Sequence, residues 1–191
     1  PRMGLRSVKT KRRFRVDPIR SEGELLLAMD TSGPYMNLGL LRGGNLLAAH
    51  TSYQPLSHAR ALLPTIHLLL EEQGFQVGQV DLYGICLGPG SFTGLRVSMS
   101  TLKAFCFAFG KQVVGVTTPE VLASAIDGEG PAGVIIDARK GEAYGALLGP
   151  GGDEVLLPPE AGTPDGALER LLEAVSSPLV IAGSGCVTYR D

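Results

Sequence analysis

The chain has 191 residues, a net charge of −2 and a 44% share of hydrophobic residues, so it can bury the core of one large domain or of two small lobes. No apolar run reaches the roughly 18 residues that cross a bilayer, and the basic stretch KTKRRFRVD has no apolar segment beside it. These features predict a soluble, cytoplasmic protein and exclude a membrane partner.

The charges are distributed unevenly along the chain. Residues 1–24 carry eight Lys and Arg against three Asp and Glu, a net +5, whereas the rest carries nine against sixteen, a net −7. A basic arm of this kind can attract nucleic acid by counterion release, but its composition is also that of a disordered extension, which is the interpretation we favour. The acidic body has no basic stripe and is a poor candidate for holding RNA alone.

In chain order, ELLLAMDTS predicts a buried strand, and NLGLL and NLLAAHTSY, separated by RGG, predict a hairpin. Ser57 is expected to cap a helix, SHARALLPTIHLLLEEQG, in which Pro64 either introduces a kink or marks the true first turn. A strand at 82–87, a glycine loop, a helix, the strand QVVGVTT and the short helix PEVLASAI follow. This order predicts an α/β lobe over residues 25–127, built on a mixed sheet.

After DGEGPAG, which we take as the boundary, the pattern begins again at residue 133. GVIIDARKGE predicts a buried strand, AYGALLG its hairpin partner, DGALERLLEAV a helix and PLVIAGSG a last strand. Asp30 and Asp137 therefore occupy equivalent places, each at the end of the first strand of its half. The second lobe, 133–191, is expected to be truncated or reduced relative to the first.

The stretch GPGSFTGLR joins a predicted strand to a predicted helix. It lacks the lysine that follows the second glycine of a Walker loop, and five residues rather than four separate Gly88 from Gly94. A glycine-rich strand-to-helix junction still favours an anion, because backbone N–H groups and the positive end of the helix dipole point outward there. Ser91 can equally cap the helix with no ligand present, so a packing turn and a ligand loop stay equal alternatives.

The helix that follows is apolar on almost every side. One stripe at helical spacing, expected to face the core, consists of Phe92, Leu95, Met99, Leu102, Cys106 and Phe109. The opposite side is small or apolar as well, and only Arg96 and Lys103 are charged. A second lobe or a partner chain must therefore cover this helix.

Metal and nucleophile chemistry finds little support in the pattern. His58 and His67 are nine residues apart on one helix and point to opposite sides, so they cannot share a metal. The cysteines Cys86, Cys106 and Cys186 are far apart, which favours buried thiols over disulfides or zinc ligands. Asp30 and Asp137 could face each other across a catalytic cleft, but strand-end carboxylates are also common caps.

These stretches resemble one family closely. LLLAMDTS, SHARALLPTIHLLLEEQG, the run from DLYGICLGPGSFTGLR to TTPEVLA, and DARKGEAYGALL are similar to the bacterial TsaB (YeaZ) family over roughly residues 25–185. The resemblance implies an actin-like (ASKHA) two-lobed fold of RNase H-like sheets. It also implies a non-catalytic paralogue of TsaD that binds TsaD, is joined by TsaE, and takes part in making threonylcarbamoyladenosine at position 37 of ANN-decoding tRNAs. The basic arm is longer than the family's usual start, and the C-terminal segment that normally completes the second lobe is absent after Asp191.

The resemblance also assigns roles to residues. It implies a partner interface on the two long helices, with the residues Ser57, Arg60, Ala61, Pro64, Leu68, Val97, Thr101, Ala104, Phe105 and Ala108. It implies vestigial ligand loops, in which the glycine loop now serves the interface, with the residues Asp30, Thr31, Ser32, Gly88, Gly90, Ser91, Gly94, Arg96, Asp137 and Arg139.

Further expectations concern ligands and partners. We expect no metal and no tightly bound cofactor, with ATP or ADP only in the assembled complex, tRNA contact only indirectly, and a homodimer of the isolated chain. Two alternatives are a stand-alone actin-like ATPase and a glycoprotease-like hydrolase, the latter without a nucleophile–base pair in the sequence.

Overall fold

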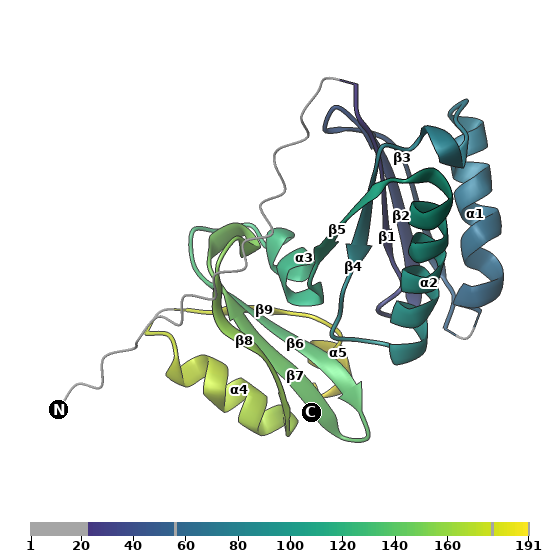
Figure 1. Ribbon diagram of the computed structural model, residues 1–191. Helices are drawn as coiled ribbons and strands as arrows, with labels where there is room; N and C mark the ends of the chain where they lie inside the picture. Colours follow the sequence, from purple (N-terminus) through teal and green to yellow (C-terminus); the bar gives the residue numbers. More distant parts are fainter. Residues whose placement is uncertain (1–22, 56, 177, 191) are drawn as a thin grey trace.

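The computed structural model describes residues 23–55, 57–176 and 178–190 of the chain. The expectation for the basic arm falls almost entirely on residues 1–22, which lie outside the described residues. The described chain forms two lobes, each built on one mixed sheet (Figure 1).

The first sheet has five strands in the order β3-β2-β1-β4-β5. β1 pairs antiparallel with β2 and parallel with β4, so the meander and the crossover strands meet at β1. The predicted hairpin is confirmed, and its turn is made by Gly43 and Gly44, whose positive φ of 56° and 83° fit the tight turn of a two-residue hairpin. The strands are β1 Leu25–Asp30, β2 Tyr35–Arg42, β3 Asn45–Tyr53, β4 Leu82–Cys86 and β5 Gln112–Val116.

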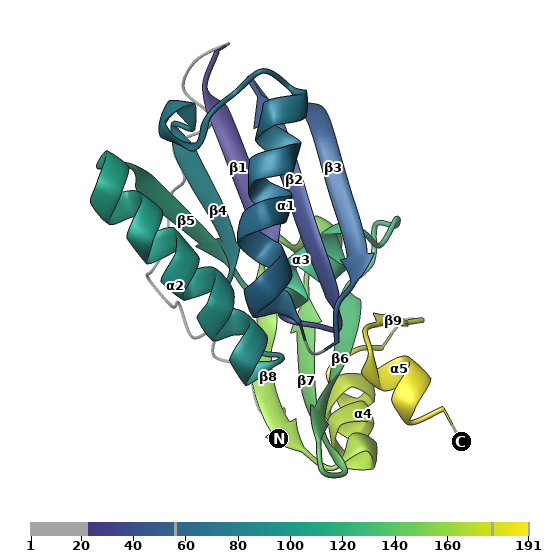
Figure 2. The ribbon, with the colours of Figure 1, turned by 90° about the vertical axis from the view of Figure 1, so that its right-hand side faces the viewer.

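Two long helices, α1 (His58–Glu72) and α2 (Phe92–Phe109), lie side by side over one face of this sheet (Figure 2). The face that they cover is lined by alternate strand residues such as Leu27, Leu40 and Tyr83, all fully buried. The side of α1 that faces the sheet consists of the buried residues Leu62, Ile66, Leu69 and Leu70, which recur at helical spacing. A single turn of 3-10 helix, Val77–Gln79, connects α1 to β4.

The second sheet repeats the first with four strands in the order β8-β7-β6-β9. β6 pairs antiparallel with β7 and parallel with β9, as β1 does with β2 and β4. The predicted repeat of topology is therefore present, and α4 occupies the place of α1 in the chain order. The elements are β6 Ala132–Arg139, β7 Glu142–Leu148, β8 Val155–Gly162, α4 Pro164–Glu173, β9 Val180–Ala182 and α5 Gly185–Thr188, with a 3-10 turn at Pro150–Gly152.

The short helix α3 (Thr118–Ser124) carries the chain from one lobe to the other. At its start, the backbone N–H of Thr118 donates to the carbonyl oxygen of Gly88, in the first lobe, at 2.9 Å. Further along the helix, Leu122 and Ala123 pack with Val134 in a core of the second sheet. We expected α3 to be part of the first lobe, residues 25–127, but its apolar residues pack with the second sheet. The chain therefore changes lobes near residue 118, before the glycine-rich stretch DGEGPAG.

Several local expectations need correction. Ser57 occupies the N-cap position of α1, but its hydroxyl contacts the side chain of Gln54 and makes no capping hydrogen bond. Pro64 does not mark the first turn of α1, because the helix begins at His58, six residues earlier. Cys86 is buried as predicted, whereas Cys106 and Cys186 are only half-buried. The edge strand β8 is missing from the predicted elements because its two prolines are typical of a loop.

Candidate functional site

The glycine loop packs directly against the residues that follow β1. The hydroxyl of Thr31 donates to the carbonyl oxygen of Gly94 at 2.8 Å, and the backbone N–H of Ser91 donates to the carbonyl oxygen of Ser32. A Cβ added at Gly90 would overlap that Ser32 oxygen, and one at Gly94 would overlap the Thr31 oxygen. Both glycines are therefore required for the backbone contact between the two loops.

The start of α2 is capped by the protein itself. Ser91 is the N-cap, and its hydroxyl accepts the Gly94 N–H at 3.2 Å, as the sequence predicts. Its carbonyl accepts the Leu95 N–H at 2.9 Å. Two of the first four N–H groups of the helix, those of Ser91 and Gly94, are thus already used. Gly88, at the start of the glycine loop, is buried and has a φ of 90°. Arg96 is exposed on the first turns of α2.

The two aspartates make the same kind of turn in the two lobes. Asp30 accepts the N–H of Ser32 at 2.8 Å, and Asp137 accepts the N–H of Arg139 at 2.7 Å. The Asp137 carboxylate also accepts the hydroxyl of Tyr189 at 2.8 Å, which raises the pKa of that phenol. This geometry is that of the capping role, one of the two alternatives that the sequence left open.

The thiol of Cys86 lies at the end of β4, beside these turns. Its Sγ is 3.1 Å from the hydroxyl of Thr118, so it links the end of the first sheet to the start of α3. Burial raises the pKa of this thiol, and the nearby Asp30 carboxylate raises it further. The thiol therefore stays protonated near neutral pH and behaves as a packed, unreactive group.

The two helix histidines do not converge. His58 is buried and its Nε2 lies 3.0 Å from the carbonyl oxygen of Gly33. His67 is exposed and lies 3.6 Å from the carboxylate of Glu71, one turn further along α1. Within residues 23–55, 57–176 and 178–190, no three His, Cys, Asp or Glu side chains are placed to hold a metal ion together.

The outer faces of α1 and α2 form a continuous surface with exposed apolar side chains, which we call the helical face. On α1, Leu63 and Leu68 are 52% and 54% exposed; on α2, Phe92 and Phe107 are 74% and 95% exposed. An apolar surface of this kind on a folded protein typically marks a contact with another chain.

The predicted interface residues divide into two groups on this face. Those exposed on it are Arg60, Pro64, Leu68, Ala104 and Ala108. Those half-buried at its margin are Ser57, Ala61, Val97, Thr101 and Phe105. Ala61, Val97 and Phe105 also pack on the core of the first lobe, where the ring centroid of Phe105 lies 5.6 Å from that of Tyr83.

Three exposed residues of the helical face were not among the predicted interface residues. The helical spacing of Phe92 and Leu102 places both in the predicted core stripe of α2. In the structure, the buried side of the helix is instead centred on Ser98, which leaves Phe92 exposed. Phe107 and Leu63 lie on neither predicted face. A helical wheel centred on the buried residues Gly94, Ser98 and Leu102 places Phe92 and Phe107 on the exposed side of α2. The sequence does not suggest this centre, because glycine and serine are weak markers of burial.

A shallow depression of about 440 Å³ lies on the helical face between the start of α1 and the first half of α2. The guanidinium of Arg96 lies 5.2 Å above the ring of Phe92 at its edge, so a cation and an aromatic ring are presented together. Its lining residues are Ala59, Phe92, Thr93, Arg96, Val97, Ser100 and Thr101.

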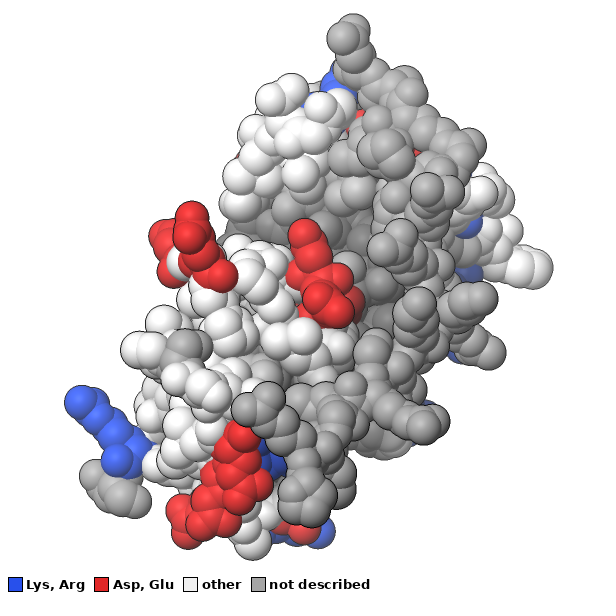
Figure 3. All heavy atoms as spheres, turned by 90° about the vertical axis from the view of Figure 1, so that its left-hand side faces the viewer, with Lys and Arg blue, Asp and Glu red and all other residues white. Residues whose placement is uncertain are grey.

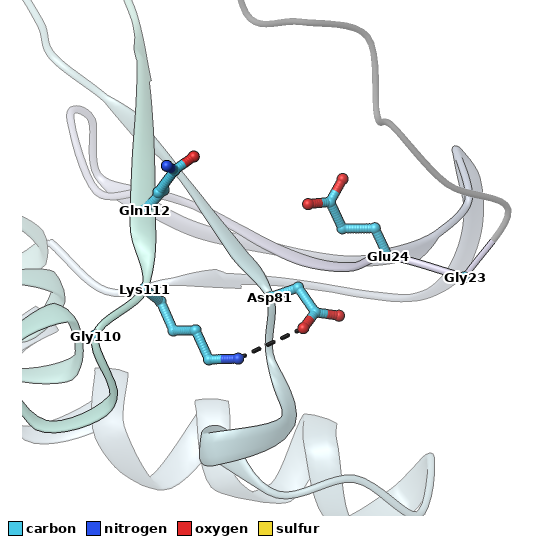
Figure 4. Close-up of a pocket in the computed structure, with 6 residues that line it drawn as sticks. All are labelled: Gly23, Glu24, Asp81, Gly110, Lys111 and Gln112. Carbon is cyan, nitrogen blue, oxygen red and sulfur yellow. Dashed lines mark hydrogen bonds and ion pairs between the residues drawn. The ribbon is translucent and has the colours of Figure 1, made fainter.

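A second, polar hollow of about 420 Å³ lies at the opposite end of the first sheet, where β1 begins (Figure 4). Lys111 and Asp81 form an ion pair of 3.4 Å across it, and Asp81 also accepts the Leu25 N–H at 3.0 Å. These contacts fix the start of β1 against β4 and β5, so a structural role accounts for them.

On the face shown in Figure 3, acidic side chains of the described residues occur in several separate groups. The Lys and Arg side chains visible there are few and scattered, and they do not form a continuous track. None of the helices in the described part of the chain is long and apolar enough to cross a membrane.

Comparison with known proteins identifies the family. Residues 53–155, more than half of the chain, match the family described as TsaD, tRNA N6-adenosine threonylcarbamoyltransferase. The YeaZ structure from Pseudomonas aeruginosa superposes with a TM-score of 0.71 at 29% identity and covers 87% of this chain and 79% of that one. The chain belongs to the TsaB (YeaZ) family. The predicted actin-like, two-lobed fold is thereby confirmed.

Curated relatives match this chain over part of their own length. The tRNA threonylcarbamoyladenosine biosynthesis protein TsaB of Bacillus subtilis (strain 168) is 28% identical over 123 residues, which are 64% of this chain and 54% of that protein. The protein of the same name from Haemophilus influenzae is 33% identical over 127 residues, 62% of this chain and 51% of that protein. The chain therefore spans about half the length of the curated relatives it matches.

Proposed function

We propose that this chain is a non-catalytic subunit of the machinery that transfers a threonylcarbamoyl group to adenosine 37 of ANN-decoding tRNAs, and that it binds a TsaD homologue through the helical face. The observation that carries the proposal is the exposure of Phe92, Phe107, Leu63 and Leu68 on adjacent helices of an otherwise well-packed lobe. The names of the relatives support a role in the biosynthesis of threonylcarbamoyladenosine in tRNA. The exposed apolar surface offers a site at which the chain can join a complex.

The closed glycine loop supports the non-catalytic part of the proposal. Phosphoryl-transfer sites rely on free N–H groups, a cation and positioned carboxylates around the phosphates. Here two N–H groups of the loop already donate within the protein, that of Ser91 to Ser32 and that of Gly94 to Ser91. Both Asp30 and Asp137 accept backbone N–H groups in their own turns. We therefore expect no tight binding of ATP or ADP by the isolated chain, and nucleotide only within the assembled complex.

The remaining partners follow from the same reasoning. A TsaE homologue is expected to join through the complex, and tRNA is expected to make its main contacts with other subunits, because the described body lacks a basic track on the face that Figure 3 shows. The isolated chain is expected to form a homodimer. The stand-alone ATPase is the second candidate, favoured only by the equivalent positions of the two aspartates.

The test is a charge placed in the helical face. Ala104 and Ala108 are exposed on α2, so Ala104→Glu leaves the monomer folded but must bury a carboxylate on binding. We expect affinity for the TsaD homologue to fall about 30-fold or more, which corresponds to about 2 kcal/mol. Leu172→Glu on α4, where Leu172 is also 52% exposed, is the matched control and should bind normally.

Isothermal titration or a quantitative pull-down with the purified TsaD homologue measures the effect. Equal affinity of Ala104→Glu, Leu172→Glu and the unaltered chain would place the partner surface elsewhere. ATP turnover by the isolated chain that disappears in Asp30→Asn would instead support the ATPase candidate.

A further inference from the structure

The turn between β6 and β7 places long side chains on a backbone that disfavours them. Arg139 pairs with Glu142, so Lys140 and Gly141 form a two-residue hairpin loop. The φ angles of Lys140 and Gly141 are 55° and 80°, and that of Arg139 is 70°. Among the residues that the structure describes, Arg139 and Lys140 are the only ones other than glycine with a positive φ. This conformation is costly for a residue with a long side chain.

The loop between β2 and β3 shows which residues suit this backbone. It consists of Gly43 and Gly44, whose φ angles of 56° and 83° are nearly those of the β6–β7 loop. Glycine and asparagine are the usual residues in two-residue loops of this kind. Lys140 therefore occupies a position that glycine fills elsewhere in the same protein. A strained residue on an exposed turn points to a function of its side chain.

The cations of the β6–β7 turn are free to meet a partner. The side chains of Arg139 and Lys140 are exposed, and neither forms an ion pair within the described residues. Glu142 lies directly opposite Arg139 in the ladder, but its carboxylate does not pair with either cation. The carboxylate of Asp137 is engaged by the hairpin itself, because it accepts the N–H of Arg139 at 2.7 Å.

The base of the turn is fixed by the end of the described chain. The hydroxyl of Tyr189 donates to the Asp137 carboxylate at 2.8 Å and lies 2.8 Å from the carbonyl oxygen of Glu142. It therefore joins the two strands of the hairpin. Figures 1 and 2 both show the turn at the end of the molecule away from the first sheet, with no labelled element beyond it. A protruding turn on a fixed base loses little conformational freedom on binding.

The equivalent turn of the first lobe carries no charge. It connects β1 to β2 through residues 31–34, which are Thr, Ser, Gly and Pro. Because the two lobes repeat one topology, the fold itself does not require cations at this place. Arg139 and Lys140 are thus an addition of the second lobe.

We propose that Arg139 and Lys140, the basic turn, bind the phosphate backbone of the tRNA on which the complex acts. An arginine guanidinium binds phosphate through two parallel hydrogen bonds, and a lysine ammonium binds it as a point charge. The segment DARKGE has one apolar side chain, that of Ala138, so it lacks the apolar centre of a protein interface. Contacts to phosphate and sugar need no such centre.

The inference rests on the proposed function, which supplies an RNA as the substrate of the complex. It departs from the expectation that tRNA touches this chain only indirectly, and it adds one local contact to those of other subunits. The helical face and the basic turn are separate, because the first belongs to α1 and α2 and the second to the β6–β7 hairpin. Binding of the TsaD homologue and binding of tRNA can therefore be changed independently.

The experiment is a fluorescence-anisotropy titration of an ANN-decoding tRNA transcript with the complex of the full chain and the TsaD homologue. Arg139→Asn/Lys140→Asn removes both charges and places asparagine, which tolerates positive φ, at both positions. We expect the dissociation constant to rise about tenfold near 0.1 M salt. The slope of log affinity against log salt should become less steep by about 1 to 2. Lys140→Arg keeps the charge and should bind normally.

The matched control is Arg42→Gln/Lys111→Gln. It removes two cations near the start of β1, where Arg42 bonds to Gly23 and Lys111 pairs with Asp81. Its net charge equals that of the asparagine variant, so a general attraction for RNA would fall equally in both. We expect the affinity of the control to fall less than about twofold.

Urea unfolding separates a lost contact from a lost fold. The midpoint of Arg139→Asn/Lys140→Asn should stay the same or rise, because asparagine relieves the strain of the turn. If this variant does not fold, Lys140→Gly replaces it, since two glycines already form this loop between β2 and β3. Lys140→Gly should weaken tRNA binding by about threefold or more.

Failure of the inference and failure of the proposed function give different results. Unchanged tRNA affinity of the asparagine variant, an equal loss in the control, or a loss of affinity for the TsaD homologue instead of tRNA would each overturn the inference. If the unaltered chain does not bind the TsaD homologue, the proposed function fails. The isolated full chain is then titrated with the same tRNA, and the difference between the two double variants decides the inference. Absence of tRNA binding in that titration would overturn it as well.

Discussion

The two lobes share a strand order and a strand-end aspartate turn, yet their helices present different surfaces. In the first lobe, α1, the equivalent of α4, has three charged residues, Arg60, Glu71 and Glu72, among fifteen. α2 has two, Arg96 and Lys103, among eighteen. In the second lobe, α4 has four charged residues, Asp165, Glu169, Arg170 and Glu173, among ten. The shared pattern of strands fixes where helices lie, and the residues on the outer side of each helix then determine whether water or another chain covers it.

The lobes also differ in which side chain closes the strand-to-helix junction. In the first lobe, the hydroxyl of Thr31, in the turn after β1, donates to the carbonyl oxygen of Gly94 at 2.8 Å. In the second, the hydroxyl of Ser184, in the junction itself, accepts the N–H of Asp137 at 3.0 Å, and Gly185 lies against Ile135. The side-chain hydrogen bond therefore comes from the strand-end turn in the first lobe and from the junction in the second.

The largest expected effect concerns the closed junction of the first lobe. Gly94→Ala would push a methyl group into the Thr31 carbonyl oxygen, a backbone atom that cannot rotate away. We expect a loss of about 3 kcal/mol in the free energy of unfolding, measured by urea denaturation. Gly130→Ala is the control, because a Cβ there meets nothing within 4 Å. A loss below about 1 kcal/mol would show that the two loops can separate cheaply.

The second expected effect concerns the helix that joins the lobes. Thr117 caps α3 in a reciprocal box: its hydroxyl accepts the N–H of Glu120 at 3.4 Å, and the Glu120 carboxylate accepts the N–H of Thr117 at 2.6 Å. Thr117→Ala should cost about 1 kcal/mol of stability, a typical capping loss.

Because α3 packs on the second core, this loss should affect that lobe more than the first. Hydrogen exchange of β6 and β7 should therefore accelerate more than that of β1 and β2. Ser124→Ala, near the exposed end of the same helix, is the control and should change neither lobe. Equal acceleration in both lobes would show that they unfold as one unit.

Much of this architecture was predictable because it depends on local hydrophobic patterns. The apolar run ELLLAMDTS predicts a buried strand, which the structure confirms as β1. The helical spacing of Leu62, Ile66 and Leu69 likewise corresponds to the buried side of α1. β8 was not predictable by the same means, because Pro158 and Pro159 are tolerated only where a strand forms an edge, and the sequence does not state which strand is outermost.

The candidate site was predictable only in part. The exposure of Ala104 and Leu68 follows from their helical angle. Phe105 lies on the side of α2 that carries the buried Ser98 and Leu102, and its ring meets that of Tyr83 on a distant strand there. The closure of the glycine loop depends on a contact with residues 31–32, some sixty positions away. Sequence spacing carries no information on such a contact.

The smallest expected effect distinguishes the lobes by two tyrosines whose phenol pKa values are raised for different reasons. Burial raises the pKa of Tyr83 in the first lobe from 10.0 to about 12. In the second lobe, the hydrogen bond to Asp137 is the main cause that raises the pKa of Tyr189, which lies near the surface. The fold stabilises the neutral phenol in both, so their contribution is fully present below pH 10 and is lost as pH rises through the folded pKa.

A titration of tyrosinate absorbance separates the two causes. Asp137→Asn removes the neighbouring charge, so the pKa of Tyr189 should fall toward its ordinary value while that of Tyr83 stays near 12. Tyr83→Phe should instead remove the last group to titrate and flatten the loss of stability between about pH 10 and 12, because no buried phenol must then ionise. If Asp137→Asn shifts both tyrosines together, the second lobe is not independent of the first, and the separate cores described above act as one.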